Sequence, residues 1–269
     1  AEKPIVVQGD RLEEAFEDEV GQWYGIILGK GSKGNVFEYT TIKNCSFGLY
    51  ADSTAEVRLS NSQIYNTAGN GLIGFHSTIE ADNCLFYNNN SNSIQLLNGG
   101  DYRFIYCTAA SYGVDAGAIG MSNFYCYDDP LVCAYRNDFR LNAAFSNCIF
   151  FGSRRDQIQF SDVTSRQTPA MFNVAFENCV VRVDDLLEQQ NDLYADFFDN
   201  ICLNCINGDR EDLLFEDANE DDYHLDSLSI AIGKALPVRP PKFNKTIEID
   251  LENKTRDSDM PDIGCFERQ

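Results

Sequence analysis

The chain has 269 residues, of which 43% are hydrophobic, and its 21 basic against 42 acidic side chains leave a formal net charge of −21. Nucleic-acid binding depends on Lys and Arg side chains that neutralise phosphates, so this balance argues against a nucleic-acid partner. No apolar run is long enough to cross a bilayer, so we expect no transmembrane segment in this chain.

The first local feature is the stretch "DRLEEAFEDEV" (10–20), in which Leu12 and Phe16 stand four apart among acidic residues. A spacing of four places both apolar side chains on one face of a helix. We therefore expect a short helix on an early loop of the fold.

From residue 37 onward, segments of alternating hydrophobicity recur, at first every 22 residues and later with wider gaps. A period of two within each segment predicts β-strands with one buried face. Three columns of inward positions align between the copies: Phe37, Leu59, Ala81, Phe104, Phe145 and Phe176; then Thr40, Ser62, Cys84, Cys107, Cys148 and Cys179; then Ile42, Ile64, Phe86, Ala109, Phe150 and Val181.

Each copy contains a break in its alternation. Val57 and Leu59 share a face with Ser62 and Ile64, although an unbroken strand would turn Ser62 outward. Asn61 lies at the break, and asparagine tolerates the left-handed backbone region that a bend between two strands requires. The equivalent positions are Asn83, Asn147 and Asn178, with Tyr39 and Tyr106 in the other two copies.

A third short strand precedes this pair in each copy. Its inward positions are Leu49, Leu72, Ile94 and Ile158, each followed two places later by Ala51, Gly74, Leu96 and Phe160. Three strands per coil of ~22 residues, stacked ~4.8 Å apart, predict an all-β fold, a single-stranded right-handed parallel β-helix. The helix is expected over 1–208, with insertions near 112–141, 153–170 and 183–203, and with 209–269 as an irregular acidic cap packed on the last coil.

Four motifs resemble the pectin-lyase-like right-handed β-helix proteins, in particular surface-exposed members common in gut Bacteroidetes, a largely uncharacterised subfamily. They are "KPIVVQGDR", "GQWYGIILGKGSKGNVFEYTTIKN", "DDYHLDSLSIAIGKA" and "PDIGCFE". The resemblance implies a secreted or cell-surface location, with a lipid anchor as one form of attachment of the full-length protein. It also implies further amino-terminal coils in a longer parent protein. A proline usual in the family is replaced here by Ile230.

The cysteines fall into groups with different interpretations. Those in the inward column behave as small hydrophobic side chains and are expected to stack as free thiols. Cys126 and Cys133 share an insertion and would form a local disulfide in an oxidising compartment. Cys202 and Cys205 form a lone CxxC, for which zinc would require two further ligands.

Calcium is a cofactor for which the sequence contains a candidate loop. Asp217, Asn219 and Asp221 have the spacing of a calcium-binding loop, but Asp222 replaces the glycine of the bend and Leu228 the closing glutamate. We therefore expect a solvated turn, with no cofactor other than adventitious calcium.

Outward strand positions look non-catalytic. Those of the third strand, Tyr50, Ile73, Gln95 and Gln159, include no acid or base. Arg58, Glu80 and Arg103 alternate in sign up the stack, as a cross-strand ion-pair ladder would. The candidates for acid–base chemistry are therefore loop residues: Arg154, Arg155 and Asp156 in "GSRRDQ", and Asp128 and Asp129 in the long insertion.

The long insertion also carries the aromatic residues Phe124, Tyr125, Tyr127 and Tyr135. Aromatic rings beside polar groups suit sugar rings, which present apolar C–H patches edged by hydroxyls. The alternative is that an insertion of this length packs its aromatic rings against the solenoid.

Three functions remain open. The first is a non-catalytic surface protein or scaffold that binds a polysaccharide, a cell-surface glycan or another extended partner along a rigid surface. The second is a polysaccharide lyase or glycoside hydrolase that works from loop residues, a hypothesis that rests mainly on the fold. The third is a structural solenoid domain of a larger surface protein.

Overall fold

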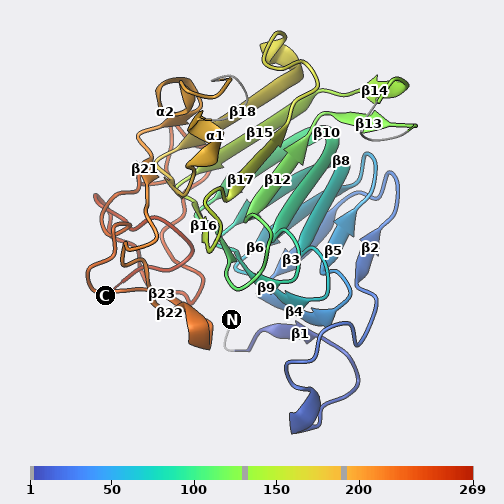
Figure 1. Ribbon diagram of the computed structural model, residues 1–269. Helices are drawn as coiled ribbons and strands as arrows, with labels where there is room; N and C mark the ends of the chain where they lie inside the picture. The colour runs from blue at the N-terminus through green and yellow to red at the C-terminus, as the bar shows by residue number, and fades with distance from the viewer. Residues whose placement is uncertain (1–2, 129–132, 189–192, 269) are drawn as a thin grey trace.

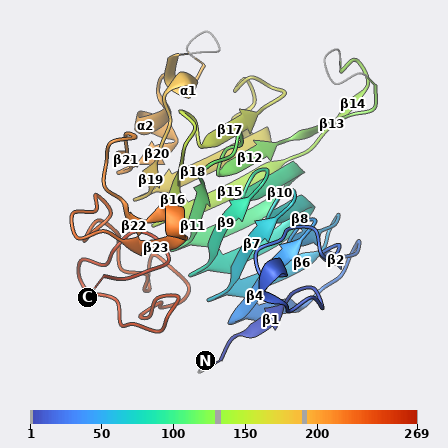
Figure 2. The ribbon, with the colours of Figure 1, turned by 60° about the horizontal axis from the view of Figure 1, so that its bottom comes forward.

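The computed structural model describes residues 3–128, 133–188 and 193–268. The chain folds as a right-handed parallel β-helix, in which each turn of the chain adds strands to the turn before it (Figure 1). Two parallel sheets run the length of the solenoid, and the C-terminal segment lies along one side (Figure 2). The predicted fold class is therefore confirmed.

The first sheet, sheet A, contains the strands that follow the asparagine bends. Its eight strands, in spatial order, are β1 (Ile5–Val7), β4 (Thr40–Cys45), β7 (Gln63–Thr67), β9 (Leu85–Asn89), β11 (Thr108–Ser111), β16 (Ile149–Gly152), β19 (Val180–Val181) and β21 (Ile206–Asn207). All neighbours pair in parallel, and the register places Ile42 beside Ile64 and Ile64 beside Phe86, as the repeat predicts.

The second sheet, sheet B, consists of two rows joined at a corner. The first row contains β2 (Ile26–Leu28), β5 (Leu49–Ala51), the first halves of β8 (Leu72–Asp82) and β10 (Ile94–Ile105), β12 (Ile119–Ser122) and β17 (Ile158–Ser161). The second row contains β3 (Asn35–Glu38), β6 (Glu56–Ser60), the second halves of β8 and β10, β15 (Leu141–Ser146), β18 (Phe172–Glu177) and β20 (Cys202–Leu203). Because β8 and β10 continue through the corner, they join the two rows into one sheet.

The bends between the second row and sheet A have the predicted left-handed backbone. Asn61, Asn83 and Asn147 have φ angles of 47°, 49° and 56°. Asn178 adopts the same conformation, as do Tyr39 and Tyr106 in the remaining copies. A bend in this region changes the chain direction while leaving the same face of the chain inside.

The interior consists of the three predicted columns, whose members from Leu59 onward are almost completely buried. Phe145 stacks on Phe104 and Phe176, with ring centroids 5.3 and 4.6 Å apart. In the thiol column the backbone N–H of Cys148 donates to the sulfur of Cys179 over 3.4 Å. Burial raises the pKa of the Cys84 and Cys148 thiols, which therefore stay protonated.

The insertion predicted at 112–141 is shorter than expected, because β12 lies within it. Ile119 pairs with Ile94 on one side and Ile158 on the other, so this segment is a solenoid strand. The remainder forms a hairpin of β13 (Phe124–Cys126) and β14 (Arg136–Asp138) that projects from the body (Figures 1 and 2). The later loops contain η2 (Pro169–Met171), α1 (Asp185–Glu188) and α2 (Phe197–Asn200).

The C-terminal segment from residue 209, here called the cap, packs along the outer side of sheet A over several coils, instead of on the last coil as expected. It contains β22 (Phe215–Asp217), η3 (Ala218–Glu220) and β23 (Asp222–Leu225) and is otherwise irregular. Its apolar side chains form one buried cluster with outward residues of sheet A. The guanidinium of Arg256 is buried there, pairs with Glu267 and donates to Asn83 at a bend.

At the N-terminal end of the described solenoid, β1, β2 and β3 each pair with one neighbour, as β17, β20 and β21 do at the other end. The predicted early helix is the short 3-10 turn η1 (Glu14–Phe16). Ile5, Ile27 and Val36 on these strands are exposed. Among the described residues, no helix is long and apolar enough to cross a membrane.

Candidate functional site

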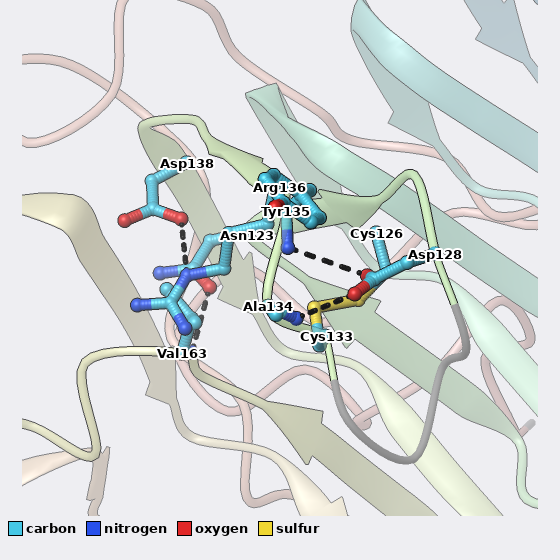
Figure 3. The surroundings of a disulfide bond; sticks show 9 residues. All are labelled: Asn123, Cys126, Asp128, Cys133, Ala134, Tyr135, Arg136, Asp138 and Val163. Atoms are coloured by element: carbon cyan, nitrogen blue, oxygen red, sulfur yellow. Dashed lines mark hydrogen bonds and ion pairs between the residues drawn. A yellow bond between two sulfur atoms is a disulfide. The ribbon is translucent and has the colours of Figure 1, made fainter.

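The β13–β14 hairpin presents the aromatic residues of the long insertion on a cross-linked support. Its strands pair antiparallel, with Tyr125 opposite Asn137, and the predicted disulfide joins Cys126 to Cys133 (Figure 3). Beyond the strands, the backbone N–H of Tyr127 donates to the carbonyl oxygen of Tyr135 over 2.8 Å. A disulfide between two such short strands reduces the conformational freedom of the hairpin and so restricts the positions of its side chains.

Of the two acidic residues predicted as catalytic in the insertion, the structure describes Asp128. The Asp128 carboxylate accepts hydrogen bonds from the backbone N–H groups of Ala134 (2.9 Å) and Tyr135 (3.4 Å), so it stabilises the hairpin (Figure 3). Asp129, the other predicted acid, lies outside the described residues.

The hairpin tyrosines face solvent, which decides between the two interpretations of the insertion. Tyr125, Tyr127 and Tyr135 are 44%, 64% and 74% exposed, while Phe124 is half-buried at the base. The rings of Tyr125 and Tyr127 meet edge to face, with centroids 5.0 Å apart. The amide of Asn137 donates to the Tyr127 hydroxyl over 2.7 Å. These rings therefore form a small aromatic surface instead of packing on the solenoid.

A second aromatic surface lies on the outer side of the first row of sheet B. Tyr24, Phe47, Tyr50 and Phe75, here called the aromatic row, run across three coils. Tyr24 and Phe47 lie just before β2 and β5, while Tyr50 and Phe75 are outward residues of β5 and β8. Successive ring centroids are 4.9, 6.4 and 6.3 Å apart. Tyr24 is 68% exposed and the other three rings are half-buried. Of these four residues, the outward strand positions had indicated only Tyr50.

Aliphatic side chains extend the aromatic row up the same face. The strand register places Ile27 and Ile73 on either side of Tyr50, and Leu97 beside Phe75. Burial and the neighbouring Asp52 raise the pKa of Tyr50, so its hydroxyl stays protonated as a hydrogen-bond donor.

The base of the hairpin meets the edge of this face. Phe139, directly after β14, packs its ring on His76 with centroids 4.9 Å apart. His76 follows Phe75, the last member of the aromatic row, and its Nδ1 lies 3.0 Å from the carbonyl oxygen of Asn98. The aromatic row and the hairpin therefore belong to one side of the molecule.

The predicted catalytic residues Arg154, Arg155 and Asp156 lie together, and each contacts residues of the fold. Arg154 pairs with Asp115 over 3.1 Å, and Arg155 pairs with Asp184 over 2.8 Å. The latter contact lowers the pKa of Asp184. Asp156 accepts from the backbone N–H groups of Asp184 and Leu186 over 2.7 and 3.2 Å, and so holds the start of α1.

The predicted calcium loop is a turn of the cap. Asp217 precedes η3 and accepts from the backbone N–H of Asn219 over 3.1 Å, while Asp221 accepts from Asn88 over 2.9 Å. Within the described ranges, no group of three or more His, Cys, Asp or Glu side chains could hold a metal ion. Cys202 and Cys205 form a disulfide, so they are not zinc ligands in this structure.

The comparisons with known proteins support the fold and go no further. A family model described as "Right handed beta helix region" matches residues 15–110. No curated protein matches the chain. No solved structure matches it either.

Proposed function

We propose that the protein is a secreted or cell-surface β-helix protein that binds an extended glycan along the outer face of sheet B without cleaving it. The observation that carries the proposal is the aromatic row, which lies uncovered on a rigid sheet face with the tyrosine hairpin standing at its edge. Aromatic faces bind the apolar C–H patches of sugar rings, and their hydroxyls bond the ring edges.

The geometry favours an extended ligand over a compact one. The aromatic row spans three coils, which stack ~4.8 Å apart, so that a chain laid along the solenoid axis meets Tyr24, then Phe47 and Tyr50, then Phe75. Because β5, β8, β10 and β12 are each hydrogen-bonded to a strand on both sides, the surface is ordered before binding. A preorganised surface loses little conformational entropy when the ligand binds.

The two disulfides support an extracellular location. Cys126–Cys133 and Cys202–Cys205 are cross-linked, and disulfides persist mainly in oxidising compartments. The net charge of −21 favours a neutral glycan, because an anionic one would be repelled.

The test is affinity electrophoresis of the purified protein in gels that contain neutral or acidic polysaccharides, with unsaturated products and reducing ends assayed in parallel. We expect retardation without cleavage, weakened about tenfold or more in Tyr50→Ala and in Tyr125→Ala/Tyr127→Ala, as for central aromatic contacts. Leu228→Ala, an exposed site on the cap, serves as the matched control. Cleavage that disappears in Arg155→Ala or Asp156→Ala would overturn the proposal in favour of an enzyme.

A further inference from the structure

The second row of sheet B carries a hollow on its outer face that the strand pattern explains. One outward column runs Arg58, Glu80, Arg103, Ala144 and Ala175 in register. The lower members are long, and the ion-pair ladder that the sequence predicts is confirmed in part: Arg103 pairs with Glu80, whereas Arg58 pairs with Glu38 of β3. Where the column changes from arginine to alanine, the side chains become too short to cover the sheet face, and a hollow of about 260 Å³ lies there.

The neighbouring outward column forms a polar wall beside this alanine floor. It runs Asp101, Asn142 and Asn173 in register on β10, β15 and β18. Asn142 donates to the Asp101 carboxylate over 2.7 Å, and Asn173 donates to the Asn142 carbonyl over 3.3 Å. Each of these amides uses one N–H in the wall and has a second to offer, and a carboxylate accepts several bonds.

The hollow adjoins the hairpin of the proposed glycan site. Arg140 lies two residues beyond β14 and donates to Asn142 over 3.2 Å. Its carbonyl oxygen accepts from the backbone N–H of Gly100 at the corner between the two rows. A glycan chain that passes the base of the hairpin therefore lies directly beside the polar wall.

We infer that this hollow is a second subsite of the glycan surface, which holds one neutral sugar ring. The inference rests on the proposed function. Two exposed alanine methyl groups form an apolar floor for the ring, while Asp101, Asn142 and Asn173 supply the acceptors and donors that hydroxyl groups require. At about 260 Å³ the hollow is below the ~300–1,000 Å³ of sites for larger ligands, a size that suits a single ring.

The charges of the hollow select against acidic sugars. Asp101 and Glu80 line it, and the Arg103 guanidinium is already paired with Glu80. A uronate carboxylate placed beside Asp101 would meet a like charge, which is unfavourable. The nearby cations are Arg103, which is paired with Glu80, and Arg140 at the rim, which donates to Asn142. The subsite therefore favours neutral hexose or pentose units and needs no calcium to bridge charges.

The experiment compares wild type, Ala144→Arg and Asn142→Ala by isothermal calorimetry. The probes are hexasaccharides of β-1,4-linked glucose, mannose and xylose, with hexagalacturonate as the acidic probe, each with calcium or with chelator. We expect Ala144→Arg to weaken the best neutral probe about tenfold or more by filling the hollow. Asn142→Ala should weaken it roughly 2- to 12-fold, the range for one hydrogen bond.

The matched control is Ala195→Arg, which adds the same side chain at an exposed site beside α2. Unaltered affinity in Ala144→Arg and Asn142→Ala, with binding lost in Tyr50→Ala, would overturn the subsite and leave the glycan function standing. Absence of binding to every probe by the wild-type protein would overturn both. Tighter binding of hexagalacturonate than of any neutral probe would overturn the assignment to neutral sugars.

Discussion

The solenoid has two outer faces that carry aromatic side chains, and the cap covers only one of them. On sheet A, Tyr65 and Tyr87 stack with centroids 4.6 Å apart, and Tyr87 packs on Tyr223 of the cap at 4.9 Å. On sheet B, the Tyr50 and Phe75 rings lie further apart, at 6.3 Å, and among the described residues the buried cluster of the cap does not include them. The repeat builds both faces in the same way, so the non-repeating segment decides which becomes core and which remains a surface.

The largest expected effect comes from emptying the covered face. Tyr223 is 2% exposed, and Tyr223→Ala should lower the free energy of unfolding by about 3–5 kcal/mol, as large-to-small changes of buried aromatic residues do. Tyr50→Ala on the bare face should cost below about 1 kcal/mol while reducing glycan retardation. Urea unfolding of both variants measures the difference, and equal losses would contradict the division into a structural and a binding face.

A smaller effect is expected at the bends that hold the cap. The Asn83 side chain donates to the carbonyl oxygen of Ile249 over 2.9 Å and accepts from Arg256 over 2.9 Å. Asn83→Ala should cost about 2–4 kcal/mol, because it combines a strained left-handed alanine with a lost partner for a buried guanidinium.

The comparison with Asn83→Gly separates these two causes. Glycine keeps the bend at φ 49° without strain but restores neither hydrogen bond, so it should recover about 1–2 kcal/mol of the alanine loss. Chemical unfolding measures both variants. If Asn83→Gly were no more stable than Asn83→Ala, strain at the bend would be excluded as a cause.

The smallest change is Tyr223→Phe, which keeps the ring and should alter stability at neutral pH by below about 1 kcal/mol. Burial raises the pKa of Tyr87 and Tyr223 above the ordinary value of ~10. A raised pKa means that the folded state favours the neutral phenols. The stability that depends on these neutral phenols is therefore fully present below pH ~10 and is lost as the pH rises through the raised pKa values.

Absorbance at the tyrosinate band, recorded during an alkaline titration, tests this expectation. Tyr87 and Tyr223 should ionise late, together with the loss of the cap. Tyr223→Phe should remove amplitude from that late phase alone. A decrease confined to the early phase would mean that water already reaches the cap face.

The fold could be predicted because its determinants are local and repeat. Inward positions alternate along each strand, and an asparagine marks most of the bends between Asn61 and Asn178, with Tyr106 as the exception, so the sequence carries one signal many times. The pattern also contained a role that was not recognised. Ser62, Cys148 and Cys179 accept hydrogen bonds from the backbone N–H of the preceding coil, which explains why this column uses small side chains with an oxygen or a sulfur.

What could not be predicted depends on residues outside the alternation. The sequence predicts an insertion where β12 lies, since Gly117 and Gly120 interrupt the apolar pattern there, although Ile119 pairs with Ile94 as the repeat requires. Tyr24 and Phe47 lie between strands, where no period places them, so the aromatic row was missed. The sequence of the insertion indicates its tyrosines as candidates. It does not determine whether they pack on the solenoid or face solvent, because that depends on how the hairpin projects from the body.

The two ends of the described solenoid differ in what covers their interior. In a solenoid each coil is stabilised by its neighbours, so local stability varies along the axis. Among the described strands, those at both ends pair with a single neighbour: β1, β2 and β3 at one end and β17, β20 and β21 at the other. At the second end, however, the buried ring of Phe197 in α2 packs against Phe160 and Phe176 and covers the interior. Amide-exchange protection in this 269-residue chain should therefore be lower in the coil of Ile5 than in the coil beneath α2, so that local stability differs between the two ends of one continuous sheet.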